Sequence, residues 1–201
     1  MMTLYSRDDD PRCHRVRIVL AEKELDVRVV EVDATRPPED LIDLNPYQTL
    51  PTLVDRDLVV YDAGIICEYL DERFPHPGLM PSDPAARAHA RVALRRIEQD
   101  WYAVADGFEH AERRDRDRVR KVLAESVLAS EPLFHLRPWF LADQFSLLDA
   151  AIAPILWRLQ KWGVELGANG AGVERYSRKL FARPSFVASM GRQAREAGRP
   201  A

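Results

Sequence analysis

Cys13 has the clearest capacity for covalent chemistry, since it stands in the first turn of a predicted helix. A thiol at the start of a helix can have a lowered pKa and act as a nucleophile. The residues just before it, Asp10-Pro11-Arg12, supply no second cysteine, and Cys67 falls in the middle of a later predicted helix. Without a partner thiol, both cysteines are better explained as small packed side chains, which suits a reducing compartment.

A second candidate for binding is the stretch Leu44–Asp55, in which Pro51 directly precedes a short apolar run. Proline cannot donate a ladder hydrogen bond, so Pro51 must stand at the first residue or the edge of a strand. If the Leu50–Pro51 bond is cis, the turn presents the free amide and carbonyl of Leu50 to an extended peptide. The alternative is an ordinary turn between a loop and a strand.

The segment Pro75–Pro81 is predicted to be a rigid linker, because its three prolines fix φ and remove amide hydrogens. It marks a boundary between two domains.

Composition places the chain among ordinary globular proteins, with 201 residues, 46% of them apolar and 30% charged. A formal charge of -3 and a pI near 6.0 exclude a general attraction to nucleic acid. No apolar run approaches the roughly 20 residues that a membrane span needs, and Met1–Asp10 lacks the apolar core of a signal peptide. We expect a cytoplasmic protein. Because the five histidines show no metal-ligand spacing, no metal is expected. No cofactor is expected either.

The elements that must position these residues begin with a βαβαββα order. Strands are predicted at Thr3–Tyr5, Asp26–Asp33, Thr52–Val54 and Leu58–Tyr61, and helices at Arg12–Leu25, Asp40–Leu44 and Asp62–Phe74. Asp62 is a good N-cap for the third helix. In the first helix, the apolar positions recur at helical spacing, which predicts that four charged residues are largely solvated. These are Arg15, Arg17, Glu22 and Lys23.

The rest of the chain is predicted to be helical. We place a thioredoxin-like domain at 1–75, a proline-rich linker at 76–83 and an all-helical domain at 84–201. Helices are predicted at Pro84–Glu112, Asp115–Ala129, Ala150–Leu159 and Val173–Phe181, with a last one from Pro184. Ser146 and Asp149 form a capping box before the most apolar helix, which we expect at the core of the second domain.

Two further features have simple explanations. The basic run Arg113–Lys121 is best interpreted as a solvated helix end rather than a nucleic-acid patch. Trp101, Trp157 and Trp162 are most simply core or dimer contacts.

The order of elements, with a proline at the entrance to the third strand, resembles the glutathione transferase superfamily. The residues that carry the resemblance are Asn45-Pro46, Leu50-Pro51, Leu53-Val54-Asp55, Tyr61-Asp62-Ala63 and the Ser146 to Asp149 box. The resemblance implies a cis bond before Pro51. It also implies that Leu50 stands where a superfamily member pairs by backbone with the cysteinyl part of glutathione.

The thiol-activating position departs from that pattern. In the superfamily, a Tyr, Ser or Cys after the first strand activates the thiol, and the corresponding residue here is Asp10. A carboxylate there would raise the pKa of the thiol. Ser6 and Tyr5 remain alternative donors. The segment Asp10–Cys13 also overlays on the Cys-Pro-x-Cys of glutaredoxin-like proteins, but the attacking first cysteine is replaced by Asp10.

The glutamyl side of the pocket departs as well. Asp62-Ala63 stands where the superfamily has Glu-Ser or Gln-Ser, so the hydroxyl that grips the carboxylate is missing. We therefore expect no catalytic residue and no glutathione chemistry. The vestigial glutathione pocket would consist of Asp10, Leu50, Pro51, Asp62 and Ala63.

A closer resemblance is to a bacterial branch of the superfamily that binds RNA polymerase and does not use glutathione. It rests on Ile42–Pro46, Pro51–Arg56, Glu68–Pro77, Arg96–Tyr102 and Phe145–Leu147. The resemblance implies a homodimer that engages RNA polymerase holoenzyme with its primary sigma factor and alters promoter use under starvation or stress. It implies that Pro75, His76 and Pro77 bind the polymerase, and that nucleic acid is reached only through the polymerase.

Two other functions stay open. An active glutathione transferase or glutathione-dependent reductase would show measurable glutathione affinity and turnover. A guanine-tetraphosphate sensor formed with a paralogous partner would need a phosphate-binding element, and the sequence contains no phosphate-cradling motif.

Overall fold

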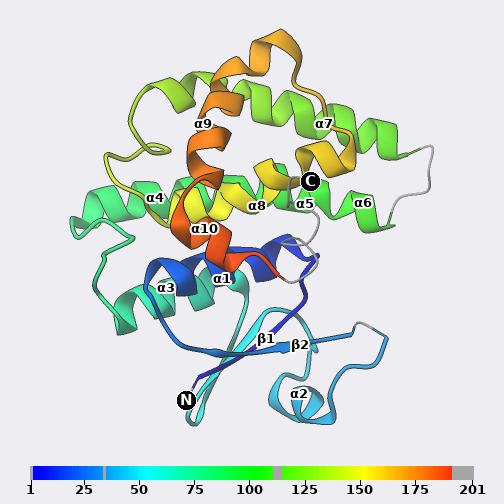
Figure 1. The fold of residues 1–201 in the computed structure, drawn as a ribbon, viewed down its shortest axis with the longest axis vertical. Coiled ribbons are helices and arrows are strands. Elements are labelled where there is room, and N and C mark those ends of the chain that lie inside the picture. Colours follow the sequence, from blue (N-terminus) through cyan, green and yellow to red (C-terminus); the bar gives the residue numbers. More distant parts are fainter. Residues whose placement is uncertain (1, 34, 111–114, 192–201) are drawn as a thin grey trace. The chain divides into compact units, whose positions relative to one another are not determined.

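The computed structural model divides the chain into two units, each with its own core (Figure 1). The structure describes residues 2–33, 35–110 and 115–191. The first unit runs to Gly78 and is joined by the segment from Pro184, while Leu79–Arg183 forms the second. This differs from the expected boundary, which assigned all of residues 84–201 to the helical domain. The reason is that the last helix packs on the first helix of the chain.

The first unit has the expected βαβαββα order, followed much later by one more helix. Its elements are β1 (Thr3–Ser6), α1 (Pro11–Glu22), β2 (Arg28–Glu31), α2 (Glu39–Leu44), β3 (Thr52–Asp55), β4 (Leu58–Tyr61), α3 (Ala63–Arg73) and α10 (Pro184–Ser189). The strand order is β2-β1-β3-β4, with β1 parallel to β2 and antiparallel to β3. Figure 1 shows α1 and α3 on one face of this sheet and α2 on the other. The predicted thioredoxin-like fold is confirmed.

Helix α1 is far more buried than its charged residues suggest. Arg15 is 1% exposed, Arg17 is 8% exposed and Lys23, just after the helix, is 6% exposed. The prediction that these three side chains are solvated is therefore wrong, and Glu22 is partly buried as well. The cause is that α1 contacts both α3 and α10, so that faces expected to meet water meet protein.

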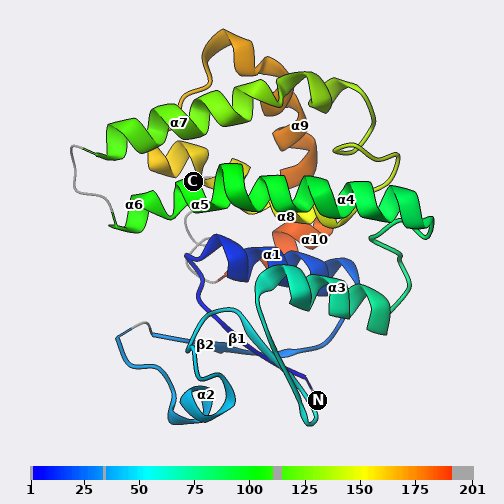
Figure 2. The ribbon, with the colours of Figure 1, turned by 180° about the vertical axis from the view of Figure 1, so that it is seen from behind.

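The second unit is all helical. Its elements are α4 (Pro84–Ile97), the π-helical turn η1 (Glu98–Tyr102), α5 (Ala103–Ala105), α6 (Gly107–His110), α7 (Arg116–Ala129), the 3-10 turn η2 (Glu131–His135), α8 (Leu147–Trp162), the 3-10 turn η3 (Gly167–Gly170) and α9 (Ala171–Phe181). Helix α8 contacts α4 and α9 (Figure 2). Most of its residues are buried, as predicted. None of the helices in the described residues is long and apolar enough to cross a membrane.

The segment predicted as one helix from Pro84 to Glu112 is interrupted twice. The π-helical turn at Glu98–Tyr102 accompanies a hydrogen bond from the buried Tyr102 hydroxyl to the Ala151 carbonyl, 2.7 Å long. A second break precedes Gly107, where a side chain would approach Val119 to 2.9 Å. At both interruptions the chain contacts another helix, and helical periodicity cannot show such contacts. Glu112 lies outside the described residues.

The capping box of α8 is confirmed, and its acidic member has a wider role. Asp149 accepts hydrogen bonds from the Ser146 amide and the Phe140 amide, each 2.8 Å long, and from the Tyr176 hydroxyl. The carboxylate is fully buried, so this one side chain joins the start of α8 to the preceding loop and to α9.

The tryptophans were predicted to be core or dimer contacts and the basic run to be a solvated helix end, and the structure agrees with these predictions in part. Trp101 is buried, and Trp162 stacks on Phe108 with 4.9 Å between ring centroids. Trp157 is 37% exposed and meets Phe181 edge-on, so it is only partly a core residue. The described part of the basic run, from residue 115 to 121, is exposed or half-buried, and Arg113 lies outside the described residues.

Candidate functional site

The register of the sheet brings the predicted pocket positions to one end of the first unit. Tyr5 of β1 lies opposite Thr52 of β3, and Thr52 lies opposite Tyr61 of β4. The end of β1, the entrance to β3 and the end of β4 are therefore neighbours. Leu50-Pro51 directly precedes β3 and Asp62-Ala63 directly follows β4, while Asp10 lies at the end of the short loop between β1 and α1.

Asp10 begins α1 as its N-cap. Its carboxylate accepts a hydrogen bond from the Cys13 amide at 2.7 Å, and Pro11 occupies the first helical position. This role accounts for an acidic residue at a helix start, where the macrodipole favours negative charge. The same negative charge would repel a thiolate brought to this position.

The alternative hydroxyl donors are both engaged within the unit. The Tyr5 hydroxyl donates to Oδ2 of Asp40 at 2.5 Å, and burial together with this hydrogen bond raises the pKa of Tyr5 to about 12. Ser6 is fully buried, and its hydroxyl oxygen accepts from the Arg17 guanidinium at 2.5 Å. Neither arrangement resembles a hydroxyl held ready to stabilise a thiolate.

Both cysteines are buried free thiols, as their packing interpretation predicted. Burial raises the pKa of Cys13, and the nearby Asp10 carboxylate raises it further. The thiol therefore stays protonated at neutral pH in spite of its place in the first turn of α1, because desolvation outweighs the helix dipole.

The Leu50–Pro51 bond is cis, which confirms that prediction. The Leu50 side chain is partly buried against Tyr5, Val32 and Leu41. Sequence reasoning missed what fastens this turn, which is the fully buried Asn45. Its side-chain amide donates to the Thr49 carbonyl at 3.1 Å and to the Thr52 hydroxyl at 2.9 Å, so the turn is tied to the first residue of β3.

Asp62 is the N-cap of α3, as predicted, with a φ of 78°. Its carboxylate accepts from the Gly64 amide at 2.8 Å and from the Ile65 amide at 3.1 Å. The first amides of the helix thus already have an anionic partner from the chain itself. The next residue, Ala63, is 3% exposed and has no hydroxyl to offer.

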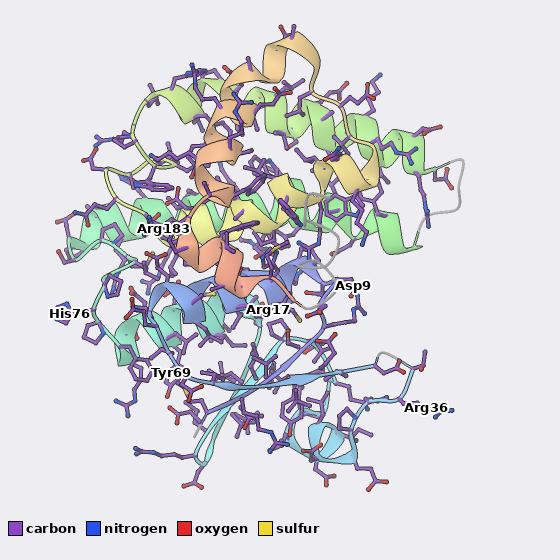
Figure 3. All side chains as sticks on the ribbon, viewed as in Figure 1. Asp9, Arg17, Arg36, Tyr69, His76 and Arg183 are labelled. Atoms are coloured by element: carbon purple, nitrogen blue, oxygen red, sulfur yellow. The ribbon has the colours of Figure 1, made fainter. Side chains whose placement is uncertain are left out.

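The Pro75-His76-Pro77 loop is a separate feature of the first unit. All three residues are exposed directly after α3, and Figure 3 shows the His76 side chain pointing outward. Helix α3 has 11 residues and is therefore about 16 Å long, with Asp62 before its first turn and the loop after its last. The loop and the pocket positions lie at opposite ends of α3.

Lys23 was missed by sequence reasoning and lies beneath this loop. Its ammonium group contacts Oδ1 of Asp71 at 2.9 Å, the Phe74 carbonyl at 2.6 Å and the Pro77 carbonyl at 2.7 Å. Its side chain is completely buried, and that of Asp71 is 5% exposed. No local signal marked it, since the partners come from α3 and the loop beyond it. In the described residues, no group of three His, Cys, Asp or Glu side chains is arranged to hold a metal ion.

Known proteins match both halves of the chain. The family described as "Glutathione S-transferase, N-terminal domain" matches residues 11–73. The stringent starvation protein A homolog of Pasteurella multocida (strain Pm70) is 50% identical, covering 95% of this chain and 91% of its own. The homolog of the same name from Coxiella burnetii (strain RSA 493 / Nine Mile phase I) is 44% identical, covering 98% and 94%.

Solved structures show the same fold. A glutathione S-transferase from Rhodospirillum rubrum F11 superposes with a TM-score of 0.82 at 26% identity, covering 94% of this chain and 91% of that one. The similarity therefore extends over the second unit as well as the first.

Proposed function

Because the chain belongs to the stringent starvation protein A family, within the glutathione S-transferase superfamily, we propose that it is a transcription regulator that binds RNA polymerase. It engages the holoenzyme with its primary sigma factor and alters promoter use under starvation or stress. The observation that carries the proposal is the 44–50% identity to stringent starvation protein A homologs over at least 95% of the chain.

The polymerase-binding element in this proposal is the loop Pro75-His76-Pro77. Its exposure and its proline content support that role, because an exposed loop with few accessible conformations loses little entropy on binding. The imidazole of His76 supplies a directional polar contact.

The protein would bind polymerase as a cytoplasmic homodimer and meet nucleic acid only through the polymerase. The formal charge of -3 supports the indirect contact, because a direct DNA-binding protein usually carries a concentrated basic surface.

We propose that the chain performs no glutathione chemistry. The engaged hydroxyls of Tyr5 and Ser6, the protonated thiol of Cys13 and the carboxylate of Asp10 support this. An active transferase or glutathione-dependent reductase is the competing function. Calorimetric titration with millimolar glutathione and an assay with a chlorinated aromatic or a peroxide separate the two, since measurable affinity and turnover would favour the enzyme.

The test of polymerase binding is a variant in which Pro75, His76 and Pro77 are all replaced by alanine. We expect this variant to lose at least about tenfold in affinity for purified holoenzyme, a loss of about 1.4 kcal/mol. A matched control replaces Pro37 and Pro38, in another proline-containing connector of the same unit, by alanine. Binding that is equal in the triple variant and the parent would show that the loop is not the binding element.

A further inference from the structure

The exposed loop Pro75-His76-Pro77 is held from inside the unit at both of its ends. The two carbonyls that Lys23 contacts belong to Phe74, just before the loop, and to Pro77, its last residue. His76, the only loop residue with a polar side chain, lies between these two points of attachment. One ammonium group therefore fixes the distance between the ends of the loop.

The number of hydrogens on the Lys23 ammonium group equals the number of acceptor oxygens around it. An ammonium group has three hydrogens, and Asp71, Phe74 and Pro77 supply one acceptor oxygen each at 2.6 to 2.9 Å. A buried charge is tolerated only when it is paired and hydrogen-bonded, and both conditions are met here. The geometry leaves Lys23 no freedom to serve a partner directly.

The loop has limited means to fix itself. Pro75 and Pro77 lack amide hydrogens, so neither can donate a main-chain hydrogen bond that would close the turn. Within the loop only His76 keeps an amide hydrogen, and Lys23 supplies a donor from outside the loop to the carbonyls at both of its ends. We propose that Lys23 is the positioning residue of the Pro75-His76-Pro77 loop, a role that rests on the proposed polymerase binding, and that Asp71 neutralises its charge.

Three variants separate loop positioning from general stability. Lys23→Met removes the donor and the ion pair with the buried Asp71 carboxylate, which destabilises the unit. The double variant Lys23→Met/Asp71→Asn removes the buried carboxylate as well, while the Phe74 and Pro77 carbonyls still lack the Lys23 donor. Asp71→Asn alone keeps the Lys23 donor and removes the charge that pairs with it.

The first readout is made on the full-length free protein and needs no polymerase. We expect nitrogen-15 relaxation to show faster motion of the His76 and Gly78 amides in the double variant than in the parent or in Asp71→Asn. Loop motion unchanged in the double variant would overturn the positioning role. This result is independent of whether the parent binds polymerase, so the failure of the proposed function would be recognised separately.

The second readout is affinity for purified holoenzyme. We expect the double variant to bind at least about tenfold more weakly than the parent, even though its melting temperature recovers relative to Lys23→Met, while Asp71→Asn stays within about threefold of the parent. A merely structural role would make affinity follow the melting temperature across the three variants. Parental affinity in the double variant would therefore overturn the role of Lys23.

Discussion

The hydroxyl of Tyr5 donates a 2.5 Å hydrogen bond to Asp40, which ties the first strand of the sheet to α2. Tyr5 is 5% exposed, whereas Asp40 lies at the surface. The bond keeps a side chain that is a candidate for thiol activation in its protonated form. Tyr5 has a hydroxyl of the kind that could activate a thiol, but in this protein the hydroxyl joins β1 to α2.

The raised pKa of Tyr5 predicts a loss of stability at high pH. Burial and the Asp40 hydrogen bond raise the folded-state pKa from 10.0 to about 12, so the protonated form is favoured in the folded state. The stabilisation is complete below pH 10.0 and is lost as the pH rises toward about 12. It amounts to on the order of 2 kcal/mol, measurable by denaturant unfolding between these pH values.

Tyr5→Phe should remove the part of this pH dependence that comes from Tyr5, while the raised pKa values of Tyr69 and Tyr176 leave the rest in place. Tyr47→Phe is the matched control, because Tyr47 is 70% exposed, and it should retain the parental dependence. If Tyr5→Phe and the parent lose stability equally across this range, the coupling of Tyr5 to Asp40 is not its source.

The burial of the two cysteines predicts that neither thiol is reactive in the native protein. Cys13 and Cys67 are both 0% exposed, and the pKa of Cys13 is raised by burial. An aromatic disulfide reagent should modify no thiol in the native state within minutes and both thiols in guanidinium. Rapid modification of Cys13 in the folded protein would instead indicate a nucleophilic thiolate and favour the reductase.

The hydrogen bonds of Arg17 link the loop after β1 to the last helix, α10. Its guanidinium donates to the Ser189 carbonyl at 3.0 Å, and to the Arg7 and Asp8 carbonyls at 3.1 and 3.2 Å. Arg17→Met should destabilise the protein by at least about 2 kcal/mol, because several hydrogen bonds to a charged donor are lost. Hydrogen exchange should rise in α10 and in the loop together.

The control for Arg17 is Arg36→Met, at an exposed arginine in the connector before α2 (Figure 3). That change should alter the free energy of unfolding by no more than about 0.5 kcal/mol. Increased exchange in the loop without any change in α10 would show that Arg17 does not join the two segments.

Removing the carboxylate of Asp149 should lower the free energy of unfolding strongly, because three hydrogen-bond donors depend on it. Asp149→Ala leaves the amides of Ser146 and Phe140 and the Tyr176 hydroxyl without their acceptor, which should cost about 3 kcal/mol or more. Asp83→Ala is the control, since Asp83 is an exposed N-cap whose carboxylate accepts a local hydrogen bond from the Ala86 amide at 2.8 Å. Asp83→Ala should lower the free energy of unfolding by about 1 kcal/mol, measured by denaturant unfolding. Equal losses of stability in Asp83→Ala and Asp149→Ala would contradict the wider role of Asp149.

Local signals in the sequence were sufficient where the partners are close along the chain. Asp62 caps amides two and three residues ahead, and Ser146 pairs with Asp149 three residues away, so both caps could be predicted. Arg17 reaches an acceptor 172 residues away and Lys23 one 54 residues away. Periodicity alone assigned both side chains to solvent, because it cannot show which distant segment will cover a helix.

The candidate sites, too, could be predicted only where local signals in the sequence define them. The pocket positions could be aligned because strand order and a proline fix them. The tie from Lys23 to the loop could not be inferred, since a lysine after an amphipathic helix is usually solvated.

The packing of α10 on α1 makes the first unit discontinuous along the chain, with the whole helical unit inserted before its last helix. Arg17 lies in α1, and Ser189, whose carbonyl accepts one of its hydrogen bonds, is synthesised more than 170 residues later. The first unit is therefore completed only after the helical unit has been synthesised. Until then, the guanidinium of Arg17 can bond to Ser6, Arg7 and Asp8 but not to Ser189.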